Sequence, residues 1–76
     1  MFVVVYGKPF CPSCDNAKRL LDHRKIDYVY KDVTTSEEDL QFIKTSGYKT
    51  FPQVFDEEGH NIGGFESLRE YVRRVA

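Results

Sequence analysis

The chain lacks tryptophan, contains only two cysteines and has no long apolar run. Two cysteines are too few for the disulfide framework that stabilises small secreted scaffolds. No apolar run approaches the roughly 20 residues needed to span a bilayer. The apolar start, MFVVVYG, has neither a basic leader nor a small-residue cleavage site. We therefore expect a cytoplasmic protein with no membrane partner.

The chain also lacks an excess of charge of either sign. Its 11 basic and 12 acidic side chains leave a formal net charge of -1. Domains that bind nucleic acid are usually strongly basic, so we expect no nucleic-acid partner. With 76 residues, the chain is expected to form a single domain over residues 1–76. We also expect it to act as a monomer.

Hydrophobic periodicity predicts four strands and three helices. The apolar, β-branched run from Phe2 to Tyr6 is typical of an interior strand. A helix is expected after Cys11, because Pro12 suits a first helical turn and apolar residues follow at helical spacing. The other expected strands are residues 26–33, 51–55 and 60–62. The second helix is expected to open at a capping box, Thr35 to Glu38, and to end at Gly47, and the third to begin near Phe65.

The order of these elements, β-α-β-α-β-β-α, predicts the fold class. The first β-α-β unit requires parallel strands joined by a right-handed crossover. The Asp56–Gly59 turn is typical of a hairpin and therefore of an antiparallel pair. We expect an α/β fold with a four-stranded mixed sheet and three helices.

Three interpretations of the motif Cys11-Pro-Ser-Cys14 compete. A zinc site needs four ligands, but His23 and His60 are far apart in the sequence and unpaired. A purely structural disulfide gains little, because closing so short a loop removes little entropy from the unfolded chain. A C-x-x-C motif beside a β-α-β pattern is instead typical of thiol–disulfide exchange. We favour this third interpretation.

The expected positions of the two cysteines assign them different catalytic roles. Cys11 precedes the helix, where unpaired N–H groups and the helix dipole stabilise a thiolate, and Lys8 adds nearby positive charge. Cys14 follows one turn later, on the inner face with Ala17, and is expected to be less exposed. We expect Cys11 to attack a substrate disulfide and Cys14 to resolve the mixed disulfide.

Over nearly its whole length the chain resembles glutaredoxins, within the thioredoxin fold. The resemblance is carried by CPSC after the first strand, by TFPQVF (residues 50–55) and by HNIGGF (residues 60–65). The segments CDNAKRLL and LREY are especially similar to the small phage-type glutaredoxins that serve ribonucleotide reductase.

The resemblance implies a glutathione-binding groove. Pro52 would be a cis-proline, and the backbone of Phe51 would pair with the peptide part of a bound thiol. Lys8 would meet a glutathione carboxylate, Thr50 and Gly64 would line the groove, and Phe65 would belong to the same glutathione-binding set.

Two further positions of this groove depart from the usual family pattern. Ser13 stands where cellular glutaredoxins usually carry tyrosine, so an aromatic wall is missing. After Phe65 the family usually has Thr/Ser-Asp, whereas this chain has Glu66-Ser67. Either Glu66, one position before the usual Asp, binds the glutathione amino group, or this contact is lost.

The resemblance implies a dithiol oxidoreductase that reduces protein disulfides and glutathione mixed disulfides. Ribonucleotide reductase is the expected protein substrate, and glutathione is the expected co-substrate. No metal or prosthetic group is expected.

Two alternatives remain open. Lys8-Pro9 also resembles the glutaredoxin-like redoxins that are reduced by thioredoxin reductase, although IGGF without tryptophan counts against them. Some glutaredoxins instead carry an iron–sulfur cluster between two protomers, through the first cysteine and glutathione. Pro12 should stiffen the start of the helix and disfavour that role.

Overall fold

The structure, a computed structural model, describes residues 1–75. Its elements follow the predicted order. They are β1 (Phe2–Gly7), α1 (Pro12–His23), β2 (Asp27–Asp32), a 3₁₀ turn (Val33–Thr35), α2 (Glu37–Thr45), β3 (Gln53–Phe55), β4 (Asn61–Gly63) and α3 (Phe65–Val75).

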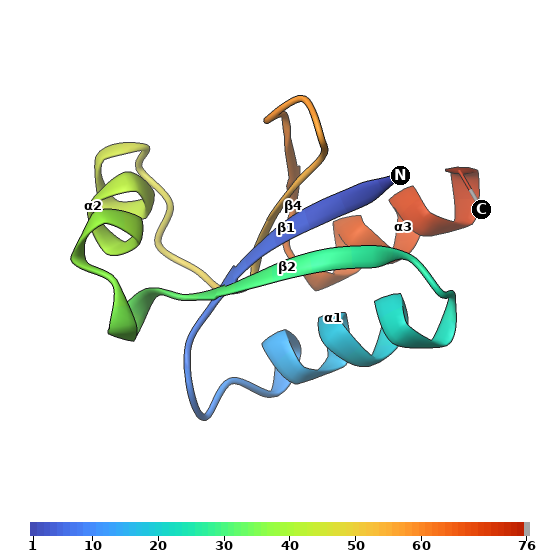
Figure 1. Ribbon diagram of the computed structural model, residues 1–76, viewed down its shortest axis with the longest axis horizontal. Coiled ribbons are helices and arrows are strands. Elements are labelled where there is room, and N and C mark those ends of the chain that lie inside the picture. The colour runs from blue at the N-terminus through green and yellow to red at the C-terminus, as the bar shows by residue number, and fades with distance from the viewer. Residues whose placement is uncertain (76) are drawn as a thin grey trace.

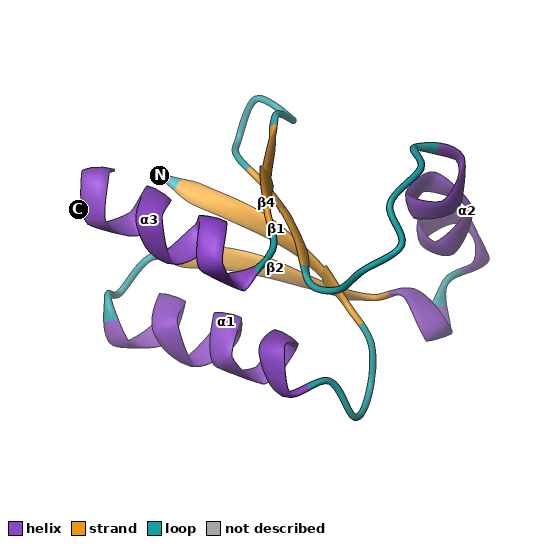
Figure 2. Cartoon of the chain, turned by 180° about the vertical axis from the view of Figure 1, so that it is seen from behind, coloured by secondary structure: helices purple, strands orange, loops and turns teal. Residues whose placement is uncertain are grey.

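The four strands form one mixed sheet in the order β2-β1-β3-β4 (Figure 1). β1 pairs in parallel with β2 and antiparallel with β3, and β3 pairs antiparallel with β4. α1 and α3 lie side by side on one face of this sheet, whereas α2 lies beyond its end (Figure 2). The predicted mixed sheet and its parallel β-α-β unit are confirmed. Among residues 1–75 no helix combines the length and apolar character that a bilayer span requires.

The predicted start of α2 is wrong by one residue. The helix is capped by Ser36, whose side chain accepts a hydrogen bond from the N–H of Asp39 at 3.3 Å. Thr35 instead closes the 3₁₀ turn, donating its hydroxyl to the carbonyl of Asp32 at 2.9 Å. The Asp32 carboxylate accepts from the N–H of Thr34 at 2.9 Å, so this local turn ends β2 before Val33 and displaces the cap.

The predicted end of α2 is confirmed at Gly47. This glycine has a φ of +85° and donates its N–H to the carbonyl of Lys44, while Tyr48 donates to Ile43, each at 3.1 Å. This pair of bonds is a Schellman motif, which satisfies the last carbonyls of a helix.

β3 and β4 differ from their predicted bounds. β3 begins at Gln53 rather than Phe51, because Pro52 has no N–H to donate to a ladder. β4 begins at Asn61 rather than His60 and extends to Gly63. The chain from Thr50 to Pro52 is therefore a loop that leads into the sheet, not part of the sheet.

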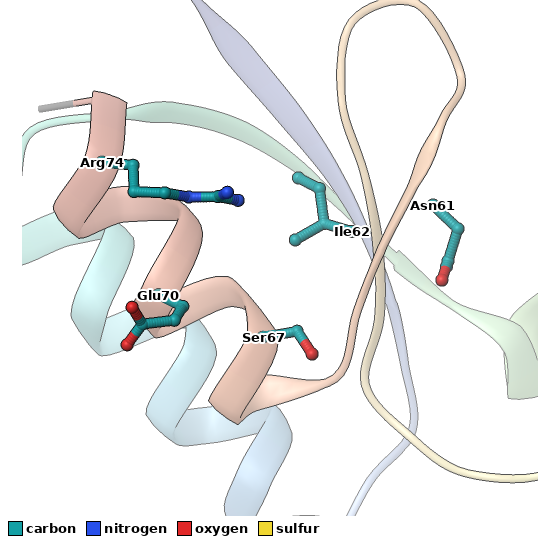
Figure 3. A pocket seen from close by; sticks show the side chains of 5 residues that line it. All are labelled: Asn61, Ile62, Ser67, Glu70 and Arg74. Atoms are coloured by element: carbon teal, nitrogen blue, oxygen red, sulfur yellow. The ribbon is translucent and has the colours of Figure 1, made fainter.

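A hollow of about 390 Å³ lies where β4, the edge strand, faces α3. The side chain of Arg74 points across it toward Ile62 (Figure 3). Its lining residues are Asn61, Ile62, Ser67, Glu70 and Arg74. Neither cysteine belongs to this lining, so the hollow is separate from the redox pair.

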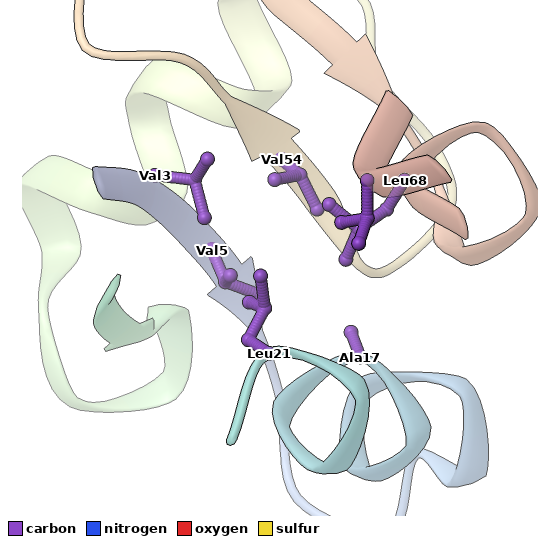
Figure 4. Close-up of a cluster of buried hydrophobic side chains, with 7 residues drawn as sticks. Val3, Val5, Ala17, Leu21, Val54 and Leu68 are labelled. Carbon is purple, nitrogen blue, oxygen red and sulfur yellow. The ribbon is translucent and has the colours of Figure 1, made fainter. Parts of the chain in front are cut away.

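The main core lies between the sheet and helices α1 and α3 (Figure 4). Alternate residues of β1 point into it because side chains alternate between the faces of a strand. Its buried members are Val3, Val5, Ala17, Leu21, Val54, Leu68 and Val72. Burying each large aliphatic side chain contributes about 1.5–3 kcal/mol, so this cluster firmly anchors α1 on the sheet.

A smaller cluster on the other side of the sheet joins α2 to β3. Val33, Ile43 and Phe55 are its buried members, and Phe51 packs against it. The helical spacing of Leu40 and Ile43 favours Phe42 as a further buried residue of α2, but Phe42 is 42% exposed although its ring lies 5.6 Å from that of Phe55. Helical spacing from Phe65 and Leu68 predicts Val75 on the inner face of α3, but Val75 is the last residue of that helix and is 47% exposed.

Candidate active site

Cys11 is the N-cap residue of α1, and Pro12 occupies the first helical position. The extended backbone of Cys11 (φ −121°, ψ 99°) is the conformation expected of an N-cap residue. One turn later, Cys14 forms a disulfide with Cys11, with the two Cα atoms 5.2 Å apart. The sequence motif therefore forms a covalent pair at the start of the helix.

The sulfur of Cys11 takes the place of the oxygen that usually caps a helix. It accepts a hydrogen bond from the N–H of Cys14 at 3.2 Å. The carbonyl of Cys11 accepts from the N–H of Asp15 at 3.1 Å and so begins the helical ladder. Because the N–H groups of a first helical turn favour negative charge, this position suits a thiolate.

The two cysteines differ in exposure, as the sequence predicted. Cys11 is 7% exposed, whereas Cys14 is completely buried beneath the helix with Ala17 and Leu21. A substrate disulfide can therefore reach Cys11 more readily than Cys14. This asymmetry fits a nucleophile followed by a resolving thiol.

Lys8 lies on the exposed loop between β1 and Cys11. Its Nζ is 5.5 Å from the centroid of the Phe51 ring, within the range of a cation–π contact. This contact brings the loop before the nucleophile against the loop that precedes β3. Two segments more than 40 residues apart in the sequence therefore border the same surface.

The loop before β3 has the geometry that the resemblance implied. The peptide bond between Phe51 and Pro52 is cis. Thr50 is exposed, Phe51 is half-buried and Pro52 is buried. Gly64 lies beside this loop, since a Cβ atom added at Gly64 would stand 3.6 Å from the carbonyl oxygen of Pro52.

Gln53 is a positioning residue that the sequence analysis missed. It is a buried polar side chain, 6% exposed, and its Nε2 donates to both the carbonyl and the hydroxyl oxygen of Thr50, at 3.0 and 3.1 Å. Its Oε1 accepts from Nδ2 of Asn61 on β4 at 3.2 Å. A glutamine among apolar strand residues in TFPQVF was the available signal, because buried polar groups require partners.

The other three predicted groove residues make no hydrogen bond with the loop of Thr50, Phe51 and Pro52 in the described part of the chain. Ser13 is exposed in the first turn of α1. Phe65 packs against the main core. Glu66 is exposed and pairs with Arg69 at 2.8 Å, one turn along its own helix. Within residues 1–75, none of them shares a hydrogen bond with Lys8 or Thr50.

One group of potential metal ligands occurs in the described part of the chain, and it contains neither cysteine. Asp56, Glu58 and His60 bring their ligand atoms within 4.8 Å of one another at the β3–β4 turn. The Asp56 carboxylate already accepts from the N–H groups of His60 and Glu58, each at 2.9 Å. Hydrogen bonding by the His60 N–H, with that of Glu58, lowers the pKa of Asp56. The cluster is therefore explained as a turn cap.

The chain is similar to known proteins over most of its length. A family model described as glutaredoxin matches residues 3–61. Glutaredoxin 1 of Rickettsia conorii is 42% identical over 69 residues, which cover 87% of this chain and 67% of that protein. The glutaredoxin of Enterobacteria phage T4 is 38% identical over 74 residues, covering 83% of this chain and 85% of that protein.

Solved structures place the fold among thioredoxin-like proteins. The glutaredoxin-like protein NrdH-redoxin from Escherichia coli has a TM-score of 0.84, covering 100% of this chain and 96% of that chain; at 21% identity this shows the fold alone. A buckwheat glutaredoxin in complex with glutathione has a TM-score of 0.77 at 28% identity, covering 95% of this chain and 68% of that chain. Together with the family match and the Cys11–Cys14 pair, these similarities show that the chain belongs to the glutaredoxin family of thiol–disulfide oxidoreductases.

Proposed function

We propose that this protein reduces protein disulfides and glutathione mixed disulfides through Cys11, with glutathione as its co-substrate. The observation that supports this proposal most directly is the position of the Cys11 sulfur at the N-cap of α1, hydrogen-bonded by the N–H of Cys14. A helix N-terminus stabilises the thiolate, which is the form of cysteine that attacks disulfides.

The forward reaction transfers two electrons from the dithiol to the substrate. The Cys11 thiolate attacks one sulfur of the substrate disulfide, forming a mixed disulfide and releasing the other sulfur, which takes up a proton. Cys14 then loses its proton and attacks the Cys11 sulfur. The second substrate thiol leaves, and the Cys11–Cys14 disulfide seen in this structure is the oxidised product.

Two glutathione molecules return the enzyme to its dithiol form. The first attacks the Cys11–Cys14 disulfide and forms a mixed disulfide with Cys11, and the second releases oxidised glutathione. We place the first glutathione between Lys8 and the loop of Thr50, Phe51 and Pro52, beside Gly64. The cation–π contact between Lys8 and Phe51 and the exposure of both Lys8 and Thr50 support this placement.

In this arrangement Lys8 provides a positive charge for a glutathione carboxylate. The backbone of Phe51 precedes the first ladder residue, Gln53, so an extended peptide could pair with it like an added strand. We include Ser13, Phe65 and Glu66 among the glutathione-binding residues on the family resemblance alone. The Glu66–Arg69 pair must open if Glu66 is to bind the amino group.

We further propose that ribonucleotide reductase is a protein substrate, and that the enzyme acts in the cytoplasm as a monomer. The choice of substrate rests on the resemblance of CDNAKRLL and LREY to the small phage-type glutaredoxins that serve ribonucleotide reductase. The 38% identity to a phage glutaredoxin over 74 residues agrees with that phage-type resemblance. Reduced thiols persist in the cytosol, where an enzyme that must return to a dithiol can turn over.

A coupled assay tests the proposed electron donor. NADPH consumption is followed with a disulfide-containing protein substrate and either glutathione plus glutathione reductase, or thioredoxin reductase alone. We expect turnover with the glutathione system. Turnover only with thioredoxin reductase would contradict the donor assignment while leaving the Cys11–Cys14 chemistry intact.

A further inference from the structure

The loop before the nucleophile exposes an aromatic side chain that the fold does not use. Phe10 precedes Cys11 directly and is 101% exposed, more than any other large apolar residue in residues 1–75. Its ring packs against neither of the two hydrophobic clusters of the described chain. Pro9 and Pro12 are exposed beside it, so the nucleophile is flanked by apolar surface.

The backbone conformation of Phe10 is also unfavourable. Its φ is +57°, in the left-handed region that disfavours residues with a Cβ atom and that glycine or asparagine adopts more readily. Phe10 therefore combines an unfavourable backbone conformation with a ring left in water. Such positions cluster at functional sites, where the conformation serves binding.

We propose that Phe10 docks an apolar side chain of a polypeptide substrate, one or two residues from the substrate cysteine. This inference rests on the proposed reduction of protein disulfides. Phe10 is the residue next to Cys11, so a substrate cysteine that is joined to Cys11 brings its own flanking residues close to the exposed Phe10 ring. An extended peptide advances about 3.3 Å per residue, so its nearest side chains come within reach of Phe10.

The apolar surface of Phe10 favours a polypeptide substrate over glutathione. Glutathione has no apolar side chain, whereas a polypeptide can place leucine or phenylalanine beside its cysteine. Burying the Phe10 ring against such a residue removes apolar surface from water. Phe10 is therefore a specificity residue that distinguishes protein disulfides with apolar flanks from polar ones.

Two synthetic peptides that carry the same disulfide test this inference. One has leucine and the other serine on both sides of the cysteines. The wild-type protein should reduce the leucine peptide with the higher kcat/KM. Phe10→Asn, which tolerates a positive φ, should lower kcat/KM for the leucine peptide about tenfold (~1.4 kcal/mol) through KM. Its kcat/KM for the serine peptide should fall less than about twofold.

Three controls separate docking from a structural effect. Phe10→Trp should restore the preference for leucine, because it returns an aromatic ring. Val29→Thr, which removes exposed apolar surface from β2, should leave the preference unchanged. Thermal denaturation should show Phe10→Asn to be at least as stable as the wild type.

The inference is overturned if the wild type reduces both peptides equally, or if Phe10→Asn lowers kcat/KM for both by the same factor. Failure of the proposed function gives a different result. In that case the wild-type protein reduces neither peptide with any electron donor.

Discussion

The backbone N–H of Cys14 points at the sulfur of Cys11, 3.2 Å away, across the first turn of α1. The resolving residue therefore contributes to the environment of the nucleophile before it reacts with it. The same turn buries the Cys14 side chain completely, while Cys11 retains 7% exposure. The first turn of α1 thus places the two cysteine side chains in different environments, which suit a nucleophile at Cys11 and a resolving thiol at Cys14.

Replacing Cys14 with serine should separate the two proposed half-reactions. The variant keeps the N–H that caps Cys11 but has no thiol to resolve a mixed disulfide. Turnover of protein disulfides should fall at least about a hundredfold, with a protein–Cys11 adduct trapped on non-reducing gels, because the resolving attack is lost. Turnover of a glutathione mixed disulfide should persist. A Cys14→Ser protein with full activity on protein disulfides would exclude the two-cysteine mechanism.

Replacing Gln53 with leucine should release the loop before β3. The change removes the two donations to Thr50 and the acceptance from Asn61. Since each of the three hydrogen bonds contributes about 0.5–1.5 kcal/mol net, we expect a loss of about 1.5–4.5 kcal/mol in the free energy of unfolding. The KM for glutathione should rise with little change in kcat, because the loop is displaced while the cysteines are not.

Gln53→Glu is the matched control for this loop. It retains an acceptor for Asn61 but loses both donors to Thr50. Its KM for glutathione should therefore rise as it does in Gln53→Leu. An unchanged KM in both variants would show that Gln53 does not position the loop.

Replacing Lys25 with glycine should stabilise the fold. Lys25 follows the C-cap residue of α1 and has a φ of +58°, and its N–H donates to the carbonyl of Asp22 at 3.1 Å. Glycine adopts this conformation without the Cβ penalty, so we expect a gain of about 0.5–1 kcal/mol in urea denaturation. Arg24→Gly, one residue earlier at a φ of −88°, should instead lower stability. Equal effects of the two changes would contradict this explanation.

Asp56 should make the stability of the β3–β4 turn depend on pH. Hydrogen bonding by the His60 N–H, with that of Glu58, holds the Asp56 pKa below its ordinary value. The ionised carboxylate therefore stabilises the fold at pH values above the pKa of aspartate in the unfolded chain, which is about 4. That stabilising contribution is lost as the pH falls through the pKa of Asp56 in the folded protein.

The variant Asp56→Asn gives the measurement for this turn. It should be less stable than the wild type at pH 7 in urea denaturation. The difference should shrink progressively below pH ~4, as the wild-type carboxyl takes up its proton. A difference that stays constant from pH 7 to pH 2 would show that the charge of Asp56 is not involved.

The strands, the helices and the redox pair were predictable from local patterns. β1 is a β-branched run, and Pro12 directly after Cys11 indicates the start of a helix. The start of α2 was not predictable with the same accuracy, because Thr35 and Ser36 both begin a capping pattern. The choice between them depends on Asp32, which accepts hydrogen bonds from Thr34 and Thr35. These bonds place Thr35 in a 3₁₀ turn and leave Ser36 to cap the helix.

Other features of the site depend on contacts that no local pattern contains. The cis bond before Pro52 was expected only from the family resemblance, since the sequence around a proline does not determine its isomer. The role of Gln53 required the hairpin to bring Asn61 beside it. The positive φ of Phe10 runs against its intrinsic preference, so propensity alone predicts the opposite.

We infer that the start of α1 keeps the Cys11 sulfur ionised near neutral pH in the reduced protein. Iodoacetamide alkylation, followed by mass spectrometry from pH 4 to pH 10, measures this for each cysteine. We predict that Cys11 reaches half its maximal rate at least about one unit below the ~8.5 of a free thiol, and reacts much faster than Cys14. A Cys11 that titrates near 8.5 and reacts no faster than Cys14 would contradict the account.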